Sequence, residues 1–342
     1  MKRSIVYTLI ASGVLLQGLL EQPAWAQIPS AQTNKAPAAA ALNGVNYIAW
    51  KGKAVGAGTI YYLNSTGSGW SAQSPIKFAQ TTQAPALAAL GDTLYLAWRG
   101  QSSGPTDSIY YTSSTNPASG WNAQQAITFA ETTAAPALAA STTTLYLAWT
   151  TATNTIEVAN YTGGAWAYST QPPATFNPSS GTAPALAIDN GVLYLAWVQE
   201  EQGTFRIMSS TLTVSESGAS WSAAMASASS NIAVAPGLGV YSLGGPYLAW
   251  TPASGTLDYA DWDDGSWGTP VGPSLPVPPG PLTPAFLNNV SQDALCEDAL
   301  YSYTFSLVYA APVSGETYDE IYVKTLFSQP PGKCTCTSPK CQ

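Results

Sequence analysis

A proline-led segment that recurs at nearly constant spacing is the strongest constraint on how this chain can fold. In its clearest copy, residues 85–98 read Pro-Ala-Leu-Ala-Ala-Leu-Gly-Asp-Thr-Leu-Tyr-Leu-Ala-Trp. Successive copies begin 48, 51, 48, 52 and 48 residues apart, at Pro37, Pro85, Pro136, Pro184, Pro236 and Pro284. A period in this range is typical of propellers and solenoids. The chain is therefore expected to be a repeat protein.

The copy that starts at Pro85 predicts four short strands. Gly91 and Asp92 form a tight hairpin signal between the first two apolar runs, and a polar loop precedes the third. The expected strands are Ala86–Leu90, Leu94–Trp98, Ile109–Thr112 and Trp121–Phe129. Four strands in ~40–50 residues make one blade of a β-propeller.

The two ends of the repeat region complement each other. Five copies are complete, whereas the sixth, which starts at Pro284, lacks its fourth strand. That strand is present near the N-terminus, because Ile28–Pro37 aligns with Ile76–Pro85 and Ile127–Pro136. We therefore predict an all-β, six-bladed β-propeller of four-stranded blades over residues 27–330. Its last blade is closed by the N-terminal strand.

The first 26 residues have the pattern of a secretory signal peptide. A basic start is followed by an apolar run from Ile5 to Leu20, and Ala24-Trp25-Ala26 provides a cleavage site. A retained membrane anchor is the alternative, although the apolar run is shorter than the ~20 residues that a bilayer span needs. The pattern predicts export, which means a secreted, periplasmic or cell-surface protein with no transmembrane segment after signal removal.

Charge and composition exclude several classes of function. Without residues 1–26, the chain has 9 Lys+Arg and 18 Asp+Glu, a net charge of −9 that argues against nucleic acid or an anionic membrane as partner. The chain has no histidine, which excludes histidine-ligated zinc chemistry and Ser-His-Asp nucleophiles. We expect a monomer with no cofactor and no metal.

All four cysteines lie close to the C-terminus, at Cys296, Cys334, Cys336 and Cys341. Three of them fall in residues 331–342, a Cys-rich tail. Export favours disulfides, and four cysteines allow three connectivities. A bond between Cys334 and Cys336 would strain its ring, so we expect Cys296 to bond to the tail and the two remaining tail cysteines to pair. A thiolate metal site is the alternative.

Residues Ala84–Trp98, Ile109–Tyr111 and Gly120–Trp121 resemble a blade of exported bacterial BNR-type propeller proteins, the sialidase-like proteins with Asp-boxes. The family's turn, Ser-x-Asp-x-Gly-x-x-Trp, is worn here, and only Asp261–Trp267 keeps acids near the expected place. The resemblance implies the propeller fold and points to non-catalytic, lectin-like members. A sialidase would need three arginines to clamp a carboxylate, whereas the mature chain has only Arg99 and Arg206.

An aromatic residue ends the second expected strand of every repeat, and Arg99 follows one of them. These candidate ligand-binding residues are Trp50, Trp98, Arg99, Trp149, Trp197, Trp250 and Tyr309. An aromatic face in a groove between blades would stack on a sugar ring while nearby polar groups hold the hydroxyls. The alternative is that these rings pack between blades as core.

Three classes of function remain open. The regular aromatic series favours a lectin-like binding module whose partners are glycans, and the alternative is an extracellular scaffold that binds surface proteins. A glycoside hydrolase would use paired carboxylates. Its candidates are scattered among polar loop residues, namely Asp107, Glu200, Glu201, Glu316, Asp319 and Glu320, so we assign no catalytic residue.

Overall fold

The computed structural model describes residues 26–54, 57–65, 69–101, 104–215, 218–228, 232, 234–242, 245–252, 257–272, 283–292 and 301–329. Residues 1–25 of the expected signal peptide lie outside these ranges, as do Cys296, Cys334, Cys336 and Cys341. Signal cleavage and disulfide pairing therefore stay predictions. Within the described ranges, no helix is long and apolar enough to cross a bilayer.

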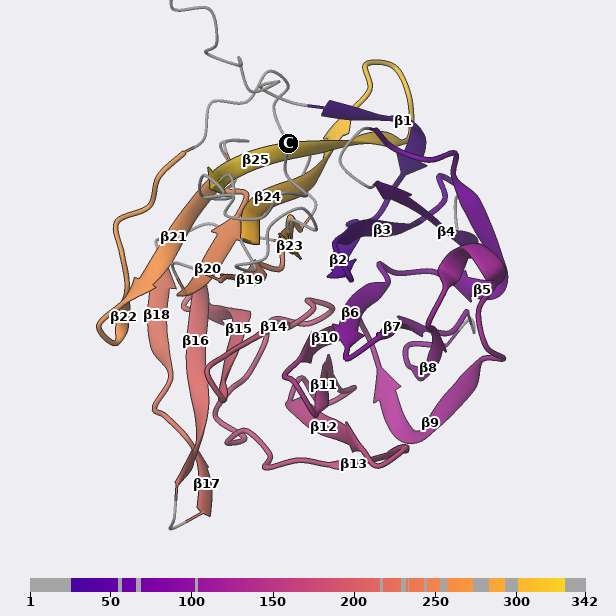
Figure 1. Cartoon of the computed structure of the whole chain (residues 1–342). Helices are drawn as coiled ribbons and strands as arrows, with labels where there is room; N and C mark the ends of the chain where they lie inside the picture. Colours follow the sequence, from indigo (N-terminus) through magenta and orange to yellow (C-terminus); the bar gives the residue numbers. More distant parts are fainter. Residues whose placement is uncertain are drawn as a thin grey trace, which may run out of the picture.

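The chain is all-β and forms six antiparallel sheets around one axis, so the predicted six-bladed β-propeller is confirmed (Figure 1). Blade 1 consists of β2 (Ala38–Leu42), β3 (Val45–Lys51), β4 (Gly58–Ser65) and β5 (Ser74–Thr81). Blade 2 consists of β6 (Ala86–Leu90), β7 (Thr93–Arg99), β8 (Asp107–Ser114) and β9 (Gln125–Thr132). The outer strand of blade 2 starts at Gln125 and not at Trp121 as predicted, after a 3-10 turn at Pro117–Ser119.

Blades 3 to 5 keep the three inner strands and differ in the outer one. Blade 3 contains β10 (Ala137–Ala140), β11 (Leu145–Thr150), β12 (Ile156–Thr162) and β13 (Ala165–Tyr168). Blade 4 contains β14 (Ala185–Asp189), β15 (Val192–Glu201) and β16 (Thr204–Ser215), with β17 (Gly218–Trp221) and β18 (Met225–Ala228) both paired to β16. Blade 5 contains β19 (Gly237–Tyr241), β20 (Gly245–Trp250), β21 (Asp258–Asp263) and the two-residue β22 (Ser266–Trp267).

Blade 6 joins the two ends of the repeat region. Its inner strands are β23 (Ala285–Gln292), β24 (Tyr301–Pro312) and β25 (Asp319–Gln329). The N-terminal strand β1 (Ala26–Thr33) pairs antiparallel with β25, which places Gln27 opposite Tyr322 and Thr33 opposite Asp319 (Figure 1). The predicted closure by the N-terminal strand is therefore confirmed, and the ring has no open seam.

Each pair of neighbouring blades shares one apolar cluster, and each cluster contains the aromatic residue at the repeat position of Trp98 in a second strand. We call these residues the inter-blade aromatics: Trp50, Trp98, Trp149, Trp197, Trp250 and Tyr309. Because both faces of a blade are covered by neighbours, the first two strands are apolar on both faces. In outer strands such as β5 and β9, exposed side chains intersperse with buried ones.

The innermost strands (β2, β6, β10, β14, β19 and β23) contact one another in a closed circle around the axis. Small residues fill them because the strands converge there. Blade 5 is the tightest place: a Cβ atom added to Gly237 would lie 2.0 Å from the carbonyl oxygen of Pro284 in blade 6. A Cβ atom on Gly239 would lie 2.3 Å from the Cβ atom of Phe286. Glycine is needed here for close approach of two backbones.

We predict that Gly237→Ala lowers the free energy of unfolding by about 1–3 kcal/mol, because the backbone of blade 6 must move to admit the methyl group. The matched control is Ala86→Gly, at the same position of blade 2, which should cost only about 0.5–1 kcal/mol through added chain entropy. Urea unfolding of both variants measures the difference. Equal losses in the two variants would contradict the close approach.

Candidate functional site

The inter-blade aromatics are buried, with exposed fractions between 0 and 2%. The hypothesis that six aromatic faces stand open to sugars is therefore corrected: the rings pack between sheets, as the alternative hypothesis held. The physical reason is that these side chains point sideways into the neighbouring blade, where the apolar clusters cover them. Trp50 and Trp98 nevertheless form part of the wall of a cavity each.

A residue on the third strand lies opposite each inter-blade aromatic in the antiparallel register. These partners are Tyr61, Tyr110, Glu157, Met208, Asp258 and Tyr322, in blade order. In blades 1 and 2 the partner is a half-buried tyrosine stacked beside the indole. The ring centroids are 6.2 Å apart for Trp50 and Tyr61 and 6.1 Å apart for Trp98 and Tyr110, with 22° between the planes in both pairs.

The groove between blade 6 and blade 1 contains a cavity of about 260 Å³, which we call the first pocket. Trp50 and Tyr61 provide aromatic surface, and the outer strands add polar side chains. The lining residues are Ser30, Gln32, Trp50, Gly52, Lys53, Ala54, Thr59, Tyr61 and Gln73. The lining therefore combines two aromatic side chains, four amide or hydroxyl side chains and one cation.

The groove between blade 1 and blade 2 contains a second pocket, of about 220 Å³. Its lining residues are Phe78, Gln80, Trp98, Gly100, Gln101, Asp107, Tyr110 and Gln124. Most of them are repeat equivalents of residues in the first pocket: Gln80 matches Gln32, and Gln124 matches Gln73. The same combination of aromatic and amide side chains thus lines two adjacent grooves.

In the next two grooves, aromatic side chains of the chain itself contact the inter-blade aromatic. Between blades 2 and 3, Tyr168 packs on Phe129 with ring centroids 4.6 Å apart, and both rings lie 6.3 Å from Trp149. Between blades 3 and 4, Phe176 stacks on Trp197 at 4.6 Å. These contacts arise because the outer strand of blade 3 is short and is followed by a coil over residues 169–184.

Arg99 does not reach into the second pocket as its sequence position suggested. It is buried, and its guanidinium donates to the carbonyl oxygen of Thr132 at 3.1 Å, to Oγ1 of Thr82 at 2.7 Å and to the carbonyl oxygen of Gly104 at 2.9 Å. The prediction that Arg99 holds sugar hydroxyls is therefore corrected. Its hydrogen bond to Gly104 holds the loop between β7 and β8, which carries Gly100 and Gln101 of the pocket wall and leads to Asp107 at the start of β8.

Lys51 has the same role in blade 1. It is fully buried, and its Nζ atom donates to Oδ1 of Asn34 at 2.8 Å and to the carbonyl oxygens of Ala54 at 2.5 Å and Gly52 at 3.3 Å. All three acceptors are uncharged. Burial, and to a smaller extent the charge of Lys35, lowers the pKa of Lys51. This cation anchors the loop that forms one side of the first pocket.

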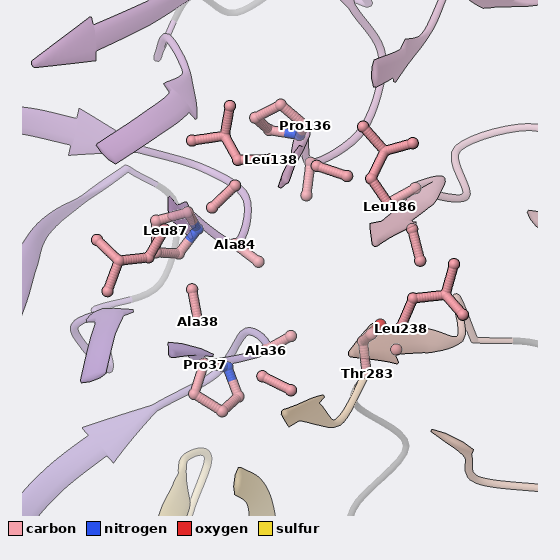
Figure 2. Close-up of a pocket in the computed structure, with 18 of the residues that line it drawn as sticks. Ala36, Pro37, Ala38, Ala84, Leu87, Pro136, Leu138, Leu186, Leu238 and Thr283 are labelled. Carbon is pink, nitrogen blue, oxygen red and sulfur yellow. The ribbon is translucent and has the colours of Figure 1, made fainter. Parts of the chain in front are cut away.

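An apolar cavity of about 140 Å³ lies on the propeller axis (Figure 2). The repeat prolines and the alanines and leucines beside them surround it, for example Pro37, Leu87, Pro136 and Leu186. At one end, a wider space of about 230 Å³ is lined by Lys35, Gln83 and Thr182 together with small residues. No acidic side chain is among the described residues that line either space. The carboxylate pair that a hydrolase would need around the axis is therefore not found there.

The sequence-predicted carboxylates are distributed around the ring. Asp107 lines the second pocket, whereas Oε2 of Glu320 accepts from Gln27 at 2.7 Å in blade 6. Burial raises the pKa of Asp319. It also raises the pKa of Glu157, which lies opposite Trp149, and that of Asp258, which lies opposite Trp250. Across the described residues, no group of three or more acidic, histidine or cysteine side chains could hold a metal ion.

Comparisons with known proteins find similarity in fold and none in sequence family. No protein-family model and no curated protein matches the chain. Among solved structures, AofleA from Arthrobotrys oligospora aligns with a TM-score of 0.55 at 13% identity, covering 86% of this chain and 87% of that one.

A lectin from Aleuria aurantia, solved as a point mutant in complex with Fucα1-6GlcNAc, aligns with a TM-score of 0.56 at 11% identity, covering 92% and 99% of the two chains. The protein YjhT aligns with a TM-score of 0.52 at 12% identity, covering 89% and 99%. The Aleuria lectin is described as a six-bladed β-propeller with a novel mode of fucose recognition. At these identities the similarity establishes the propeller fold. The resemblance to Asp-box proteins stays a sequence prediction.

Tyr309, the inter-blade aromatic of blade 6, makes the fold sensitive to alkali. Burial, and secondarily Tyr322, raises its pKa well above the ordinary value of 10.0. The neutral phenol is therefore favoured in the folded state, while the unfolded chain ionises near pH 10. The resulting stabilisation is complete below about pH 10 and is lost as the pH rises above it.

We predict that Tyr309→Phe, which cannot ionise, loses stability less steeply than the wild type above pH 10. The difference in slope should approach about 1.4 kcal/mol per pH unit, the value for one proton. Urea unfolding between about pH 9 and pH 11 measures it. Identical slopes for the two proteins would contradict a neutral, buried phenol.

Proposed function

We propose that the mature chain is an exported, non-catalytic propeller that binds glycans, with one sugar ring in each of the first and second pockets. The observation that carries this proposal is the repetition of one pocket design in adjacent grooves. An indole, a stacked tyrosine and two glutamines recur at equivalent positions, while the backbone around them belongs to different blades. Repetition of a lined cavity is typical of a binding surface that engages several units of one ligand.

The chemistry of the lining suits a carbohydrate. A tyrosine face stacks on the apolar CH face of a sugar ring, and glutamine amides both donate to and accept from hydroxyls. The volumes, about 260 and 220 Å³, lie below the ~300 Å³ at which sites for drug-sized ligands begin, which suits a single ring. The fucose-binding lectins with a similar fold support glycan binding as the class of function.

The proposal of a non-catalytic role is supported by the scarcity of acids in the lining of the two pockets. Cleavage of a glycosidic bond uses two carboxyl groups about 5–10 Å apart. Among the described residues, the first pocket is lined by no acid and the second by Asp107 alone. A binding role needs no such pair.

We predict that the double variant Tyr61→Ala, Tyr110→Ala, which alters both pockets, no longer binds glycans. Either substitution alone should weaken glycan binding by about tenfold. The reason is loss of the stacking surface and of one pocket wall. The matched control is Tyr110→Phe, which keeps the ring and should retain most of the affinity. A glycan array followed by calorimetry measures the effect, and circular dichroism checks that each variant is folded. If the wild-type protein gives no binding signal on the array, the proposal is contradicted, and the protein-binding scaffold becomes the hypothesis to test.

Export is the second part of the proposal and rests on residues 1–26. Cleavage after Ala26 would leave Gln27 as the first residue, at the start of the closing strand β1. Mass spectrometry of the protein recovered from the extracytoplasmic fraction should find this N-terminus. An intact Met1 in that fraction would instead indicate a retained anchor.

A further inference from the structure

We propose that the two pockets sort sugars by charge: the first pocket takes a carboxylated sugar, a uronate, and the second takes a neutral sugar. This inference rests on the proposed function, because it names the substrate class of the same two sites. It is carried by the few positions at which two otherwise equivalent pockets differ.

The shared positions make the pockets a natural matched pair. Trp50, Tyr61 and Gly52 of the first pocket have the equivalents Trp98, Tyr110 and Gly100 in the second. The two glutamines are also common to both. Three differences bear on charge and polarity: Lys53 stands where the second pocket has Gln101, Ser30 stands where it has Phe78, and Gly58 begins the third strand where the second pocket has Asp107. In addition, Ala54 and Thr59 line only the first pocket.

Lys53 gives the first pocket its charge. Its Nζ atom lies 4.4 Å from the ring centroid of Tyr318, so the ammonium is held by the loop between β24 and β25 of blade 6. The side chain is exposed and lines the pocket. A carboxylate on a bound ring would form a charge-assisted hydrogen bond with this ammonium, which is stronger than a neutral one.

Two further lysines lie behind the same pocket. Lys51 is buried beside its loop, and Lys35 is near enough for its charge to lower the pKa of Lys51. Asn34 links this group, since it accepts from Lys51 and donates to the carbonyl oxygen of Ala54 at 3.2 Å. Lys35, Lys51 and Lys53 are three of the nine cationic residues after position 26, a part of the chain whose net charge is −9. Acids are also present on the blade 6 side, where Glu320 and Asp319 lie opposite Gln32 and Thr33, and Arg99 is the equivalent of Lys51 behind the second pocket. The difference in charge between the pockets therefore rests on Lys53 and Asp107, which line them.

The second pocket has the opposite bias. Asp107 lines it, with Oδ1 accepting from its neighbour Ser108 N at 2.9 Å, and the guanidinium of Arg99 is directed to Thr132, Thr82 and Gly104. A carboxylate in the wall repels an anionic ring and accepts hydrogen bonds from hydroxyls. Phe78, 40% exposed, adds apolar surface in place of Ser30. A neutral, hydroxyl-rich ring fits these groups.

The test compares methyl β-glucuronide with methyl β-glucoside, which differ only in a carboxylate for a hydroxymethyl group. With the mature chain carrying Tyr110→Ala, so that the first pocket alone is intact, the glucuronide should bind about tenfold more tightly. With Tyr61→Ala the order should reverse. Calorimetry measures both, and raising the salt from about 0.05 to 0.5 M should weaken only glucuronide binding to the first pocket.

Variants on the surface keep the test independent of any folding defect in the tyrosine variants. In the otherwise wild-type chain, Lys53→Gln, which installs the residue of the second pocket, should remove the tight glucuronide site and leave glucoside binding at the second pocket unchanged. Lys77→Gln, an exposed lysine of β5 that lines neither pocket, should leave it unchanged. Asp107→Asn should raise glucuronide binding at the second pocket, detected by ligand-observed NMR.

The outcomes separate this inference from the proposed function. If both sugars bind each pocket equally and Lys53→Gln changes nothing, charge sorting is wrong while glycan binding stands. If methyl glucoside 6-sulfate binds the first pocket more tightly than the glucuronide, the anion is a sulfate ester and the uronate assignment is overturned. If no sugar binds, here or on the array, both proposals fail.

Discussion

The structure depends on an inter-blade aromatic packed between every two neighbouring sheets. Each inter-blade aromatic comes from the second strand of its blade and joins a cluster that contains residues of the preceding blade. A buried ring of this size removes a large apolar area from water and is rigid, so it sets the spacing between sheets as well as stabilising them. Blade 6 uses Tyr309 in this place, and closure by β1 adds Ile28 and Ala31 to the cluster around Trp50.

The pockets are a consequence of the same packing. Where a ring holds two sheets apart near the middle of the blade, the outer strands diverge, and what fills the space depends on the residues around it. In the groove beside Trp197, the side chain of Phe176 packs on the indole. In the groove beside Trp149, Phe129 and Tyr168 pack there. Beside Trp50 and Trp98 the third strand supplies a tyrosine. The outer strand supplies Ser30 and Gln32 in the first groove and Gln80 with the 40% exposed Phe78 in the second, and a cavity remains in both. Binding capacity thus arises where the repeat packs incompletely.

The fold could be predicted from the sequence because its evidence is periodic. The proline spacing sets the number of blades, and the match of Ile28–Thr33 to Ile76–Thr81 reveals the closing strand. The burial of the inter-blade aromatics could not be derived in the same way, since both faces of an inner strand are apolar and alternation carries no signal. The tyrosines opposite them were missed, although a signal existed: Ile-Tyr-Tyr occurs at residues 60–62 and 109–111, whereas residues 156–158 read Ile-Glu-Val.

Arg99 and Lys51 show why single charged residues resist prediction from sequence. A cation after an apolar strand normally indicates a solvent-facing loop, yet both side chains are buried by carbonyl groups whose position depends on the loop they hold. The blades without such a cation have Thr150, Val198, Thr251 or Ala310 at this position, and Thr150 donates to the carbonyl oxygen of Thr182 at 2.8 Å instead. In blades 1 and 2 the cation donates to carbonyl oxygens of the loop between the second and third strands, and that loop forms one side of a pocket. Among the described residues, a buried cation and an aromatic-lined pocket thus occur together in blades 1 and 2, and in both the cation holds the loop at the side of the pocket.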